Sequence, residues 1–282
     1  MTSPAGIPAR PPGTGRIVTW NLWWRFGDEP ERRRPAVAAT LAALDADVVC
    51  LQEVYGDDRG ADDAAELGAR LGAHVVTTAP VGRDGRSLGN AVLSRWPVLD
   101  RGEERLPGPD GRPGHRRAVW AVLGSPGGRL PVVCTHLAFR FDESALRAAQ
   151  LAAVCSLAAG LRGGSADPGA APPVVLCGDL NATPDSDEIR ALTGRRAPPV
   201  AGLVFTDCWP QVRDDPGHTW VRRNPYLADA TWPERRLDYV LTSWPRAAPV
   251  GNPVQAFLVG DGPVDGVWPS DHLGVAVDLR TG

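Results

Sequence analysis

The stretch VVLCGDLN at residues 174–181 is the part of the sequence on which the interpretation of the chain depends. A short apolar run is typical of a buried β-strand, and this run ends at a glycine. Asp179 and Asn181 follow two residues apart, and side chains at that spacing in an extended chain point to the same side. The pair could bind a cation, orient a water molecule or donate to an anionic oxygen. It could equally cap the next segment in a turn, so the rest of the chain has to decide.

Composition places the chain among soluble globular proteins. It has 282 residues, enough for a large core, with 43% hydrophobic and 22% charged residues. All the basic residues are arginines, which excludes any mechanism that needs a lysine nucleophile or Schiff base. The net charge of −3 lacks the basic bias of a protein that is mainly bound to nucleic acid. A hydrolase, however, needs only a local basic track around its cleft.

Cysteine usage and the chain's N-terminal segment bear on the compartment. The five cysteines are odd in number and show no CxxC spacing, so no disulfide framework is predicted. Residues 1–15 are rich in Pro and Gly and lack the apolar core of a signal peptide. No run approaches the roughly 18 apolar residues of a membrane span. We therefore expect a disordered lead-in over 1–15, a cytoplasmic location and no stable membrane insertion.

Apolar spacing predicts a chain in which strands alternate with a few helices. The predicted helices cover residues 35–44, 61–71, 143–161 and 185–192. The predicted strands cover residues 16–22, 47–51, 73–78, 89–94, 117–123, 131–134, 174–177, 203–208, 218–221, 237–242, 254–259 and 274–279. Residues 106–115 hold several Pro and Gly and are predicted to form a surface loop.

Five of these apolar strands end in, or carry, a polar group with chemical capability, and a sixth such group stands just before the last strand. A buried polar group without a partner costs about 1–3 kcal/mol, so packing alone explains such a recurrence poorly. The groups are Asn21, Glu53, His136, the pair Asp179 and Asn181, Asp238, and Ser270-Asp271-His272. Each has an ordinary explanation as a cap or surface residue, but six together indicate one shared site.

Aromatic residues follow the first strand at once. Trp23, Trp24 and Phe26 stand directly after Asn21 and Leu22. They could seal the edge of the core, or they could form a loop at the mouth of a site that stacks on a nucleobase or contacts a membrane. The sequence leaves these alternatives open.

Seven short motifs in order along the chain resemble the endonuclease/exonuclease/phosphatase superfamily. They are TWNL at 19–22, LQE at 51–53, GNAVLSRWP at 89–97, THL at 135–137, GDLNATP at 178–184, RLDYVL at 236–241 and SDHLGV at 270–275. The resemblance implies an α/β fold, specifically a four-layer α/β/β/α sandwich of two mixed β-sheets flanked by helices. It also implies that residues 16–280 form a single domain.

The resemblance further implies a metal site. Glu53 would be the principal ligand of a divalent cation, with Asn21 beside it and Asp271 contributing. Carboxylate and carboxamide oxygens suit a hard ion such as Mg²⁺ or Mn²⁺.

The resemblance also implies a catalytic role for each of several residues. His272 would be the general base, or the imidazolium that binds the phosphate, and Asp238 would hold its other ring nitrogen. Asp179 would orient or deprotonate the attacking water, Asn181 would hold a phosphate oxygen, and His136 would donate to the developing charge.

Two further residues match positions of the family, and one motif differs from that of the family's repair enzymes. Asn90 and Arg117 lie where substrate contacts are expected. Exonuclease III-type repair enzymes carry a tyrosine-and-asparagine motif where this chain has His136. The chain is thus closer to pancreatic deoxyribonuclease, the sphingomyelinases, the deadenylases and the inositol phosphatases, which makes abasic-site repair the less expected role.

These observations predict a metal-dependent phosphodiesterase that cleaves nucleic acid by in-line attack of an activated water. One alternative is a phosphatase or sphingomyelinase-like phospholipase on small or lipid phosphoesters. The other is a catalytically dead relative that serves as a binding module. A dead copy is expected to have lost some of the polar groups at the strand ends, and this chain retains all of them.

Overall fold

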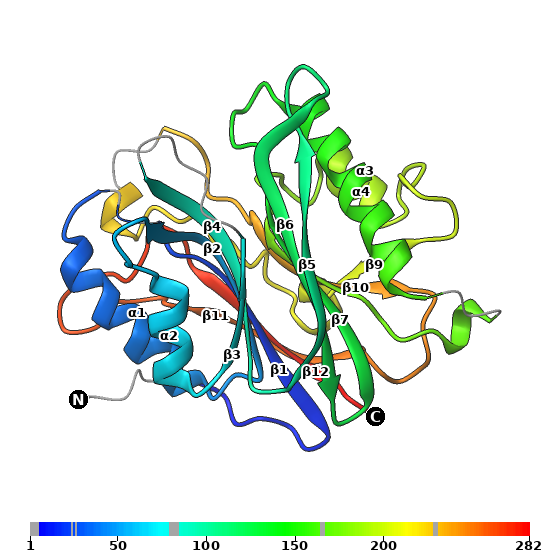
Figure 1. Cartoon of the computed structure of the whole chain (residues 1–282), viewed down its shortest axis with the longest axis horizontal. Helices are drawn as coiled ribbons and strands as arrows, with labels where there is room; N and C mark the ends of the chain where they lie inside the picture. Colours follow the sequence, from blue (N-terminus) through cyan, green and yellow to red (C-terminus); the bar gives the residue numbers. More distant parts are fainter. Residues whose placement is uncertain (1–5, 24, 26, 79–84, 164–166, 228–230) are drawn as a thin grey trace.

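Two β-sheets packed face to face form the centre of the molecule, and helices cover the outer face of each. The computed structural model describes residues 6–23, 25, 27–78, 85–163, 167–227 and 231–282. Across Figure 1 the layers follow in the order helices, first sheet, second sheet, helices. This is the four-layer arrangement of mixed sheets that the motifs implied.

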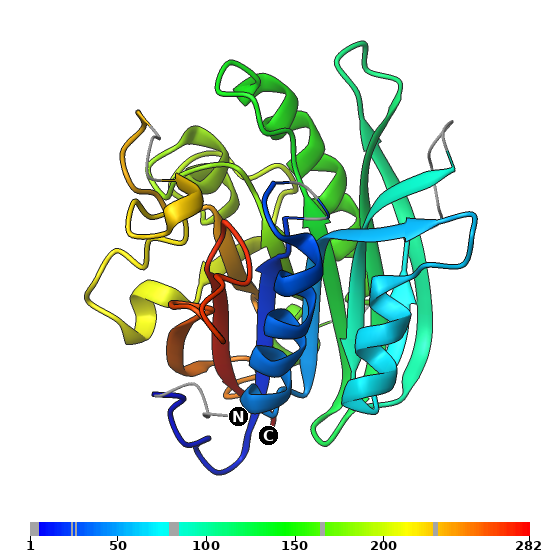
Figure 2. The ribbon, with the colours of Figure 1, turned by 90° about the vertical axis from the view of Figure 1, so that its left-hand side faces the viewer.

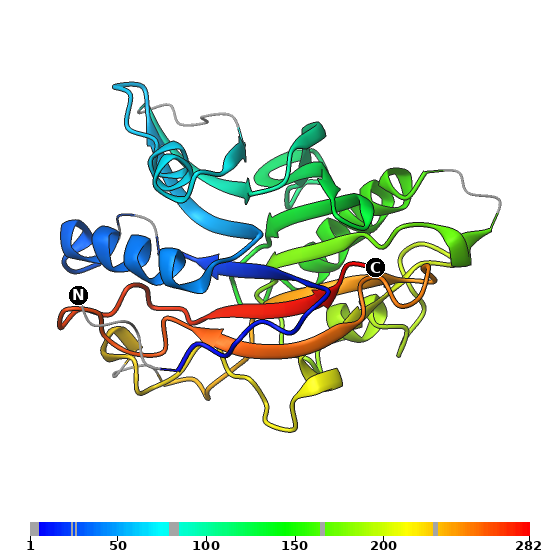
Figure 3. The ribbon, with the colours of Figure 1, turned by 90° about the horizontal axis from the view of Figure 1, so that it is seen from below.

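The first sheet joins both ends of the sequence. Over the described residues it has six strands in the spatial order β11-β12-β1-β2-β4-β3. They span Pro253–Val259 (β11), Gly274–Arg280 (β12), Thr14–Asn21 (β1), Val48–Asp57 (β2), Arg86–Ser94 (β4) and His74–Thr77 (β3). Strands β1 and β2 are parallel and the other pairs are antiparallel, so the sheet is mixed. Figure 3 shows β11, β12 and β1 side by side.

The second sheet is built from the middle of the chain. Its six described strands lie in the order β5-β6-β7-β8-β10-β9. They span Val98–Pro107 (β5), Pro113–Ser125 (β6), Gly128–His136 (β7), Val175–Asp179 (β8), Asp238–Trp244 (β10) and Val204–Asp207 (β9). Only β7 and β8 are parallel. The opening stretch of the sequence analysis is therefore a central strand, β8.

Helices shield the outer faces. In the described part of the chain they span Pro30–Leu44 (α1), Asp63–Leu71 (α2), Ser144–Leu161 (α3), Asp187–Leu192 (α4) and Trp209–Val212 (α5), with single 3₁₀ turns at Pro168–Ala170 and Pro225–Leu227. Figure 2 shows α1 and α2 lying over the first sheet. Leu151 and Val154 of α3 and Ile189 of α4 pack on the second sheet.

Strand periodicity explains how the layers are held together. Successive side chains of a strand point to opposite faces, so each sheet has an inner and an outer apolar face. Ile17, Cys50, Cys134 and Cys177 belong to the inner core between the sheets. The five cysteines are free and buried in the structure.

The structure corrects the predicted loop over residues 106–115. Strand β5 ends at Pro107 and β6 begins at Pro113, so only the residues between them form the turn. Most of β5 is exposed and charged, which hides the alternation that identifies a strand. Leu106 is nevertheless fully buried under the helices.

The predicted strand over 218–221 is also wrong. Only an isolated bridge between Trp220 and Arg235 forms there. In addition, α1 begins at Pro30 rather than Pro35. Strand β1 begins at Thr14, and Arg10 ahead of it binds Asp47 at 2.7 Å.

Helix α3 corrects the expectation about membrane spans. Among the described helices it is long and apolar enough to cross a membrane by length and composition alone. Its Leu151, Val154 and Ala158 are buried against the second sheet. A core helix of a soluble protein passes the same test, so this is weak evidence for a membrane span.

Candidate active site

The inner faces of both sheets end in polar groups at the same edge. The side chains of β1, β7, β8 and β10 continue their strands' inward alternation past the apolar core. The residues so placed are Asn21, His136, Asp179 and Asp238, all less than a tenth exposed. The predicted convergence of separate strand ends is therefore present in the structure.

A close approach of two parallel strands positions Asp179. His136 is its register partner across β7 and β8, and His136 Nε2 lies 3.4 Å from Asp179 Oδ2. The preceding Gly178 has φ +154°, and a Cβ there would lie 2.0 Å from the carbonyl oxygen of Thr135. Only glycine fits, so this residue allows β8 to bring Asp179 against His136.

Hydrogen bonds hold the Asp179 carboxylate from two directions. The backbone N–H of Asn181 donates to Oδ1 at 2.9 Å, and Nδ2 of Asn21 donates to Oδ2 at 3.0 Å. Asn181 makes this turn with φ +49°, a conformation that asparagine tolerates. Burial, followed by the charge of Asp238, raises the pKa of Asp179 to about 6 in spite of these donors.

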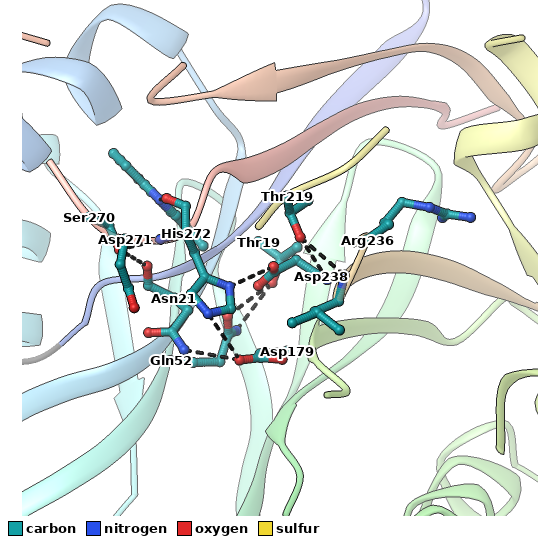
Figure 4. Close-up of polar contacts among 12 residues, drawn as sticks. Thr19, Asn21, Gln52, Asp179, Thr219, Arg236, Asp238, Ser270, Asp271 and His272 are labelled. Carbon is teal, nitrogen blue, oxygen red and sulfur yellow. Dashed lines mark hydrogen bonds and ion pairs between the residues drawn. The ribbon is translucent and has the colours of Figure 1, made fainter. Parts of the chain in front are cut away.

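His272 and Asp238 form a buried pair (Figure 4). His272 Nδ1 lies 2.9 Å from Asp238 Oδ2, and its Nε2 faces Asp179 Oδ2 at 3.8 Å. Burial alone would lower the pKa of His272, but surrounding carboxylates outweigh it and raise the pKa well above its ordinary value. In order of effect these carboxylates belong to Asp238, Asp179 and Asp271. The imidazole is therefore protonated at neutral pH.

Residues to which the sequence analysis gave no role of their own hold the His272 loop in place. Ser270 Oγ donates to the carbonyl of Asn21 at 2.7 Å, and Trp20 Nε1 donates to the carbonyl of His272 at 2.9 Å. The buried Asn224 donates from Nδ2 to the carbonyl of Ser270 at 2.8 Å. Ser270 stands in a motif that could have indicated this role, whereas Asn224 lies in a loop without any pattern.

Thr219 was also missed, because its role depends on hydrogen bonds to residues distant in the chain. Its hydroxyl accepts the backbone N–H of Leu237 at 3.1 Å and that of Asp238 at 3.4 Å. Its carbonyl accepts the N–H of Leu273 at 2.8 Å. This single residue therefore ties the segment before Asp238 to the segment after His272 (Figure 4).

A β-bulge directs Glu53 into the cluster. The pairing of β2 with β4 shifts register between Leu51 and Val54, and Glu53 has φ +54°. Such a bulge re-aims one side chain of a strand. Glu53 Oε1 accepts only a long 3.4 Å bond from Asn21 Nδ2, and the buried Oε2 has no partner among the described residues.

The pKa of Glu53 reflects the lack of hydrogen-bond partners for its carboxylate. Burial, followed by the charges of Asp271 and Asp179, raises its pKa to about 7, although His272 and Arg116 act in the opposite direction. The pKa of Asp271 is itself raised by burial. A carboxylate whose oxygen is buried, unpaired and close to other acids has the environment of a cation ligand.

Two oxygen-rich places could hold a divalent cation. One is the unpaired Glu53 carboxylate with Asp271 near it, oxygen donors that fit Mg²⁺ or Mn²⁺. Asn21 lies beside them but turns its Nδ2 toward Glu53, and its Oδ1 accepts the backbone N–H of Trp23 at 2.9 Å. In the other, ligand atoms of Asp179, Asp238 and His272 lie within 4.8 Å of one another. The second requires a neutral imidazole as ligand, whereas His272 is held as a cation by Asp238. The donor chemistry therefore favours the Glu53 side.

The structure places the remaining predicted residues, Asn90 and Arg117, next to each other. Asn90 donates from Nδ2 to the carbonyl of Arg117 at 2.8 Å. The guanidinium of Arg117 pairs with Glu103 on β5 rather than with the polar cluster. Arg116, which was not predicted, is electrostatically coupled to Asp179 and to Glu53. The structure thus brings the neighbouring arginine to the site.

His136 is uncharged in this setting. Burial, followed by the charges of Arg116 and His272, lowers its pKa well below the ordinary value. A neutral imidazole carries one N–H, so His136 can donate one hydrogen bond within the cluster.

Aromatic side chains stand near Glu53 and Asp271, with which the neighbouring Arg33 interacts electrostatically. The Trp23 ring lies 4.7 Å from the ring of Tyr226, and the Arg33 guanidinium lies 4.6 Å over Trp23. Trp23 therefore packs against other residues at the rim. The predictions for Trp24 and Phe26 concern residues outside the described ranges.

Comparison with known families identifies the group to which this geometry belongs. Residues 18–272 match the model of the Endonuclease/Exonuclease/phosphatase family. The chain belongs to this family. The assignment confirms the resemblance carried by the seven motifs. A search of curated proteins finds no significant match.

Solved structures with the same fold agree with the assignment to the endonuclease/exonuclease/phosphatase family. An endonuclease/exonuclease/phosphatase from Beutenbergia cavernae DSM 12333 is 26% identical, with a TM-score of 0.70 over 97% of this chain and 72% of that chain. D. rerio TDP2 complexed with a single-strand DNA product is 21% identical, with a TM-score of 0.72 over 94% and 98%. The human Nocturnin catalytic domain with a bound sulfate anion is 19% identical, with a TM-score of 0.71 over 96% and 96%. The last two likenesses show the shared fold.

Proposed function

We propose that this member of the endonuclease/exonuclease/phosphatase family is a divalent-metal-dependent phosphodiesterase that cleaves nucleic acid. The observation that carries the proposal is the His272–Asp238 pair at 2.9 Å, facing Asp179 and sharing one polar cluster with Glu53, whose Oε2 is unpaired. This arrangement supplies fixed positive charge, a carboxylate that can accept a proton and an unfilled oxygen ligand. Phosphoester hydrolysis needs these groups together.

Glu53 and Asp271 would hold Mg²⁺ or Mn²⁺, with Asn21 beside them. When bound, the ion would act as a Lewis acid toward a phosphoryl oxygen. In the metal-free protein Glu53 is kept partly protonated by burial and by neighbouring acids. Its position after the β2 bulge aims the carboxylate into the cluster, where the substrate phosphate would lie.

His272 and Asp179 divide the proton chemistry between them. The raised pKa of His272 means that it carries its proton at neutral pH and cannot serve as the base in that state. It is better suited to bind the anionic phosphoryl group through Nε2–H, while Asp238 fixes the ring. Asp179, with a pKa of about 6, is largely ionised at pH 7 and can orient the attacking water and accept its proton.

Asn181 and His136 would complete the phosphate contacts. The backbone turn at Asn181 fixes its position relative to Asp179, and its side chain already donates to the carbonyl of Leu137 at 3.2 Å. The second N–H of its carboxamide remains available for a phosphate oxygen. The neutral His136 would donate its single N–H to developing negative charge.

Nucleic acid is the substrate class we favour. TDP2, which shares the fold, has been crystallised with a single-strand DNA product, and the Nocturnin domain with a sulfate anion. Arg116 adds positive charge on the substrate side of the cluster. The substrate panel described below also tests the alternative of a phosphatase or phospholipase. A dead binding module would need no intact set of polar groups, and this chain has kept its set.

A substrate panel tests the proposal. Purified protein is incubated with single-stranded DNA, plasmid DNA, RNA, a chromogenic phosphodiester, a chromogenic phosphomonoester and sphingomyelin, each with Mg²⁺, with Mn²⁺ or with EDTA. We expect cation-dependent cleavage of the diesters, greatest on a nucleic acid. Full activity in EDTA would exclude the metal mechanism, and exclusive activity on the monoester or on sphingomyelin would establish the alternative.

A further inference from the structure

Three exposed aromatic side chains lie in segments that are close to His136 and Asp238 in the sequence. Phe139, Phe141 and Trp232 are 64%, 51% and 47% exposed. Phe139 is three residues beyond His136, and Trp232 is six residues before Asp238. An extended chain covers about 3.3–3.6 Å per residue, so these rings lie within reach of nucleotides next to a phosphate in the cluster. The proposed chemistry does not use them.

These side chains form a layered stack. The Phe141 and Trp232 rings are stacked with centroids 4.0 Å apart and planes 22° apart. The Arg235 guanidinium lies 4.7 Å over the Phe141 ring and 4.5 Å over the Trp220 ring. The guanidinium therefore lies between two rings, and the Trp232 ring extends the stack beyond Phe141.

Positive charge accompanies the rings. Neither Arg235 nor Arg116 forms an ion pair with a described residue, and Nε of Arg235 is buried without a hydrogen-bond partner. Both guanidinium groups interact electrostatically with Asp179. Arg116 also lies 6.0 Å from the centroid of the Phe139 ring. The rim thus alternates flat rings with arginines that no carboxylate neutralises directly.

We propose that the exposed rings of Phe139 and Trp232, the latter supported by Phe141, stack on the bases of a single-stranded nucleic acid beside the scissile bond, and that Arg235 and Arg116 bind its phosphates. This rests on the proposed function and specifies its substrate class. Aromatic side chains stack on unpaired bases of any sequence, and arginines between them bind the backbone. Bases in a duplex are already stacked and paired, so such a platform selects single strands. The five side chains are called the stacking platform below.

The neighbourhood of the platform argues for nucleic acid over a membrane surface. The exposed Arg140 and Asp142 flank Phe141 on both sides, and Glu143 follows. Inserting these rings among lipids would draw the carboxylates toward the acyl region, which is unfavourable. Two of the rings are also paired face to face instead of projecting separately. Stacking on a base leaves the charged neighbours in water.

Kinetics on two substrates test the platform. Phe141→Ala and Trp232→Ala are compared with wild type on a labelled single-stranded oligonucleotide and on a small chromogenic phosphodiester. We expect the ratio of kcat/KM on the oligonucleotide to that on the small diester to fall about tenfold or more, mainly through KM. Phe141→Tyr and Trp232→Phe keep a ring and should restore most of the ratio.

A matched control separates this effect from general damage to the fold. Trp244→Ala removes a similarly exposed tryptophan at the far end of β10 from Asp238 and should change neither rate. Circular dichroism and thermal melting of each variant check that it is folded. If Phe141→Ala and Trp232→Ala behave like Trp244→Ala, the platform proposal fails while the proposed function stands.

Two further outcomes distinguish the proposals. A wild-type protein that cleaves neither substrate would overturn the proposed function itself. A wild type that cleaves plasmid DNA and the small diester but not the single-stranded oligonucleotide would overturn the platform alone. Vesicles of phosphatidylcholine and phosphatidylserine form a third arm. Loss of vesicle binding in both alanine variants, with unchanged oligonucleotide kinetics, would identify the rings as a membrane contact and overturn the platform.

Discussion

The two sides of the polar cluster differ in how fully the protein itself satisfies them. On one side, His272 is held by Asp238 at 2.9 Å, and Asp179 accepts bonds from Asn21 and from the backbone of Asn181. On the other side, Glu53 Oε1 accepts a long 3.4 Å hydrogen bond from Asn21 and lies 3.9 Å from His136 Nδ1, and its Oε2 has no hydrogen-bond partner among the described residues. The His272 side is assembled before any ligand arrives, whereas the Glu53 side is incomplete without one.

This difference has a physical consequence. A buried unpaired carboxylate destabilises the fold until a proton or a cation neutralises it. The pKa of Glu53, raised to about 7, records that cost. One exception exists on the His272 side, where Asp238 Oδ1 is also buried without a partner. We infer that the His272 side is built for chemistry and the Glu53 side for cation binding.

The largest expected effect comes from removing the charge on the assembled side. His272→Ala should lower kcat on any cleaved phosphodiester by about 10²–10⁴-fold, because the positively charged imidazole next to the phosphate is lost. Steady-state kinetics measure the loss, and an unchanged circular dichroism spectrum shows that the fold is kept. A variant that retains a tenth of the wild-type rate would remove His272 from the chemistry.

Exchanging one carboxylate on each side tests the division of roles. Glu53→Gln should raise the cation concentration for half-maximal activity more than tenfold, because a neutral amide replaces an anionic ligand. Asp179→Asn should lower kcat about 100-fold with little change in that concentration. Cation titrations of activity measure both. The reverse result would place the ion between Asp179, Asp238 and His272 instead.

Stability against pH provides a third comparison. Because Glu53 binds its proton more tightly in the folded state, its ionisation removes stability as pH rises from about 4.5 to about 7. Replacing it with glutamine should therefore stabilise the protein at pH 8 by up to about 3 kcal/mol, and should have little effect at pH 5 or below. Thermal melts in EDTA should show a gain of about 5 °C at pH 8.

Magnesium supplies the control for that experiment. In wild type at pH 8, added Mg²⁺ should raise Tm because it binds only the folded state. The Glu53→Gln variant should show a much smaller rise. Equal rises in both proteins would mean that the stabilising ion lies elsewhere.

The smallest effects are expected at the neighbouring arginines on β6. Arg116→Ala should lower kcat/KM about tenfold on a nucleic acid, because its charge acts on Asp179 and Glu53. Arg117→Ala should change it by less than about threefold, since its guanidinium pairs with Glu103 outside the cluster. Matched kinetics on one oligonucleotide measure both. A larger loss in Arg117→Ala would show that Arg117 contacts the substrate, as the motif comparison indicated.

The local pattern of apolar residues was sufficient to predict many of the strands and helices, and the types of residue that gather at the strand ends. Burial of alternate side chains is a property of each strand by itself, so the apolar runs that end at Asn21 and Asp179 could be recognised without tertiary information. Helix α3 was predicted within one residue of its start. Strand β5 was missed because its charged residues are exposed at the edge of a sheet, where burial imposes little pattern.

The order of the motifs by itself determined the family and the set of polar groups. Only the tertiary structure decided which groups pair, because the contacts join residues far apart in the chain: Asn21 with Asp179 across 158 residues, and His272 with Asp238 across 34. The tertiary structure also decided the protonation of His272 and Glu53, since their pKa values depend on burial and on neighbours from both sheets. The bulge that turns Glu53 inward and the stack around Phe141 likewise follow from packing between strands and loops, which no local periodicity encodes.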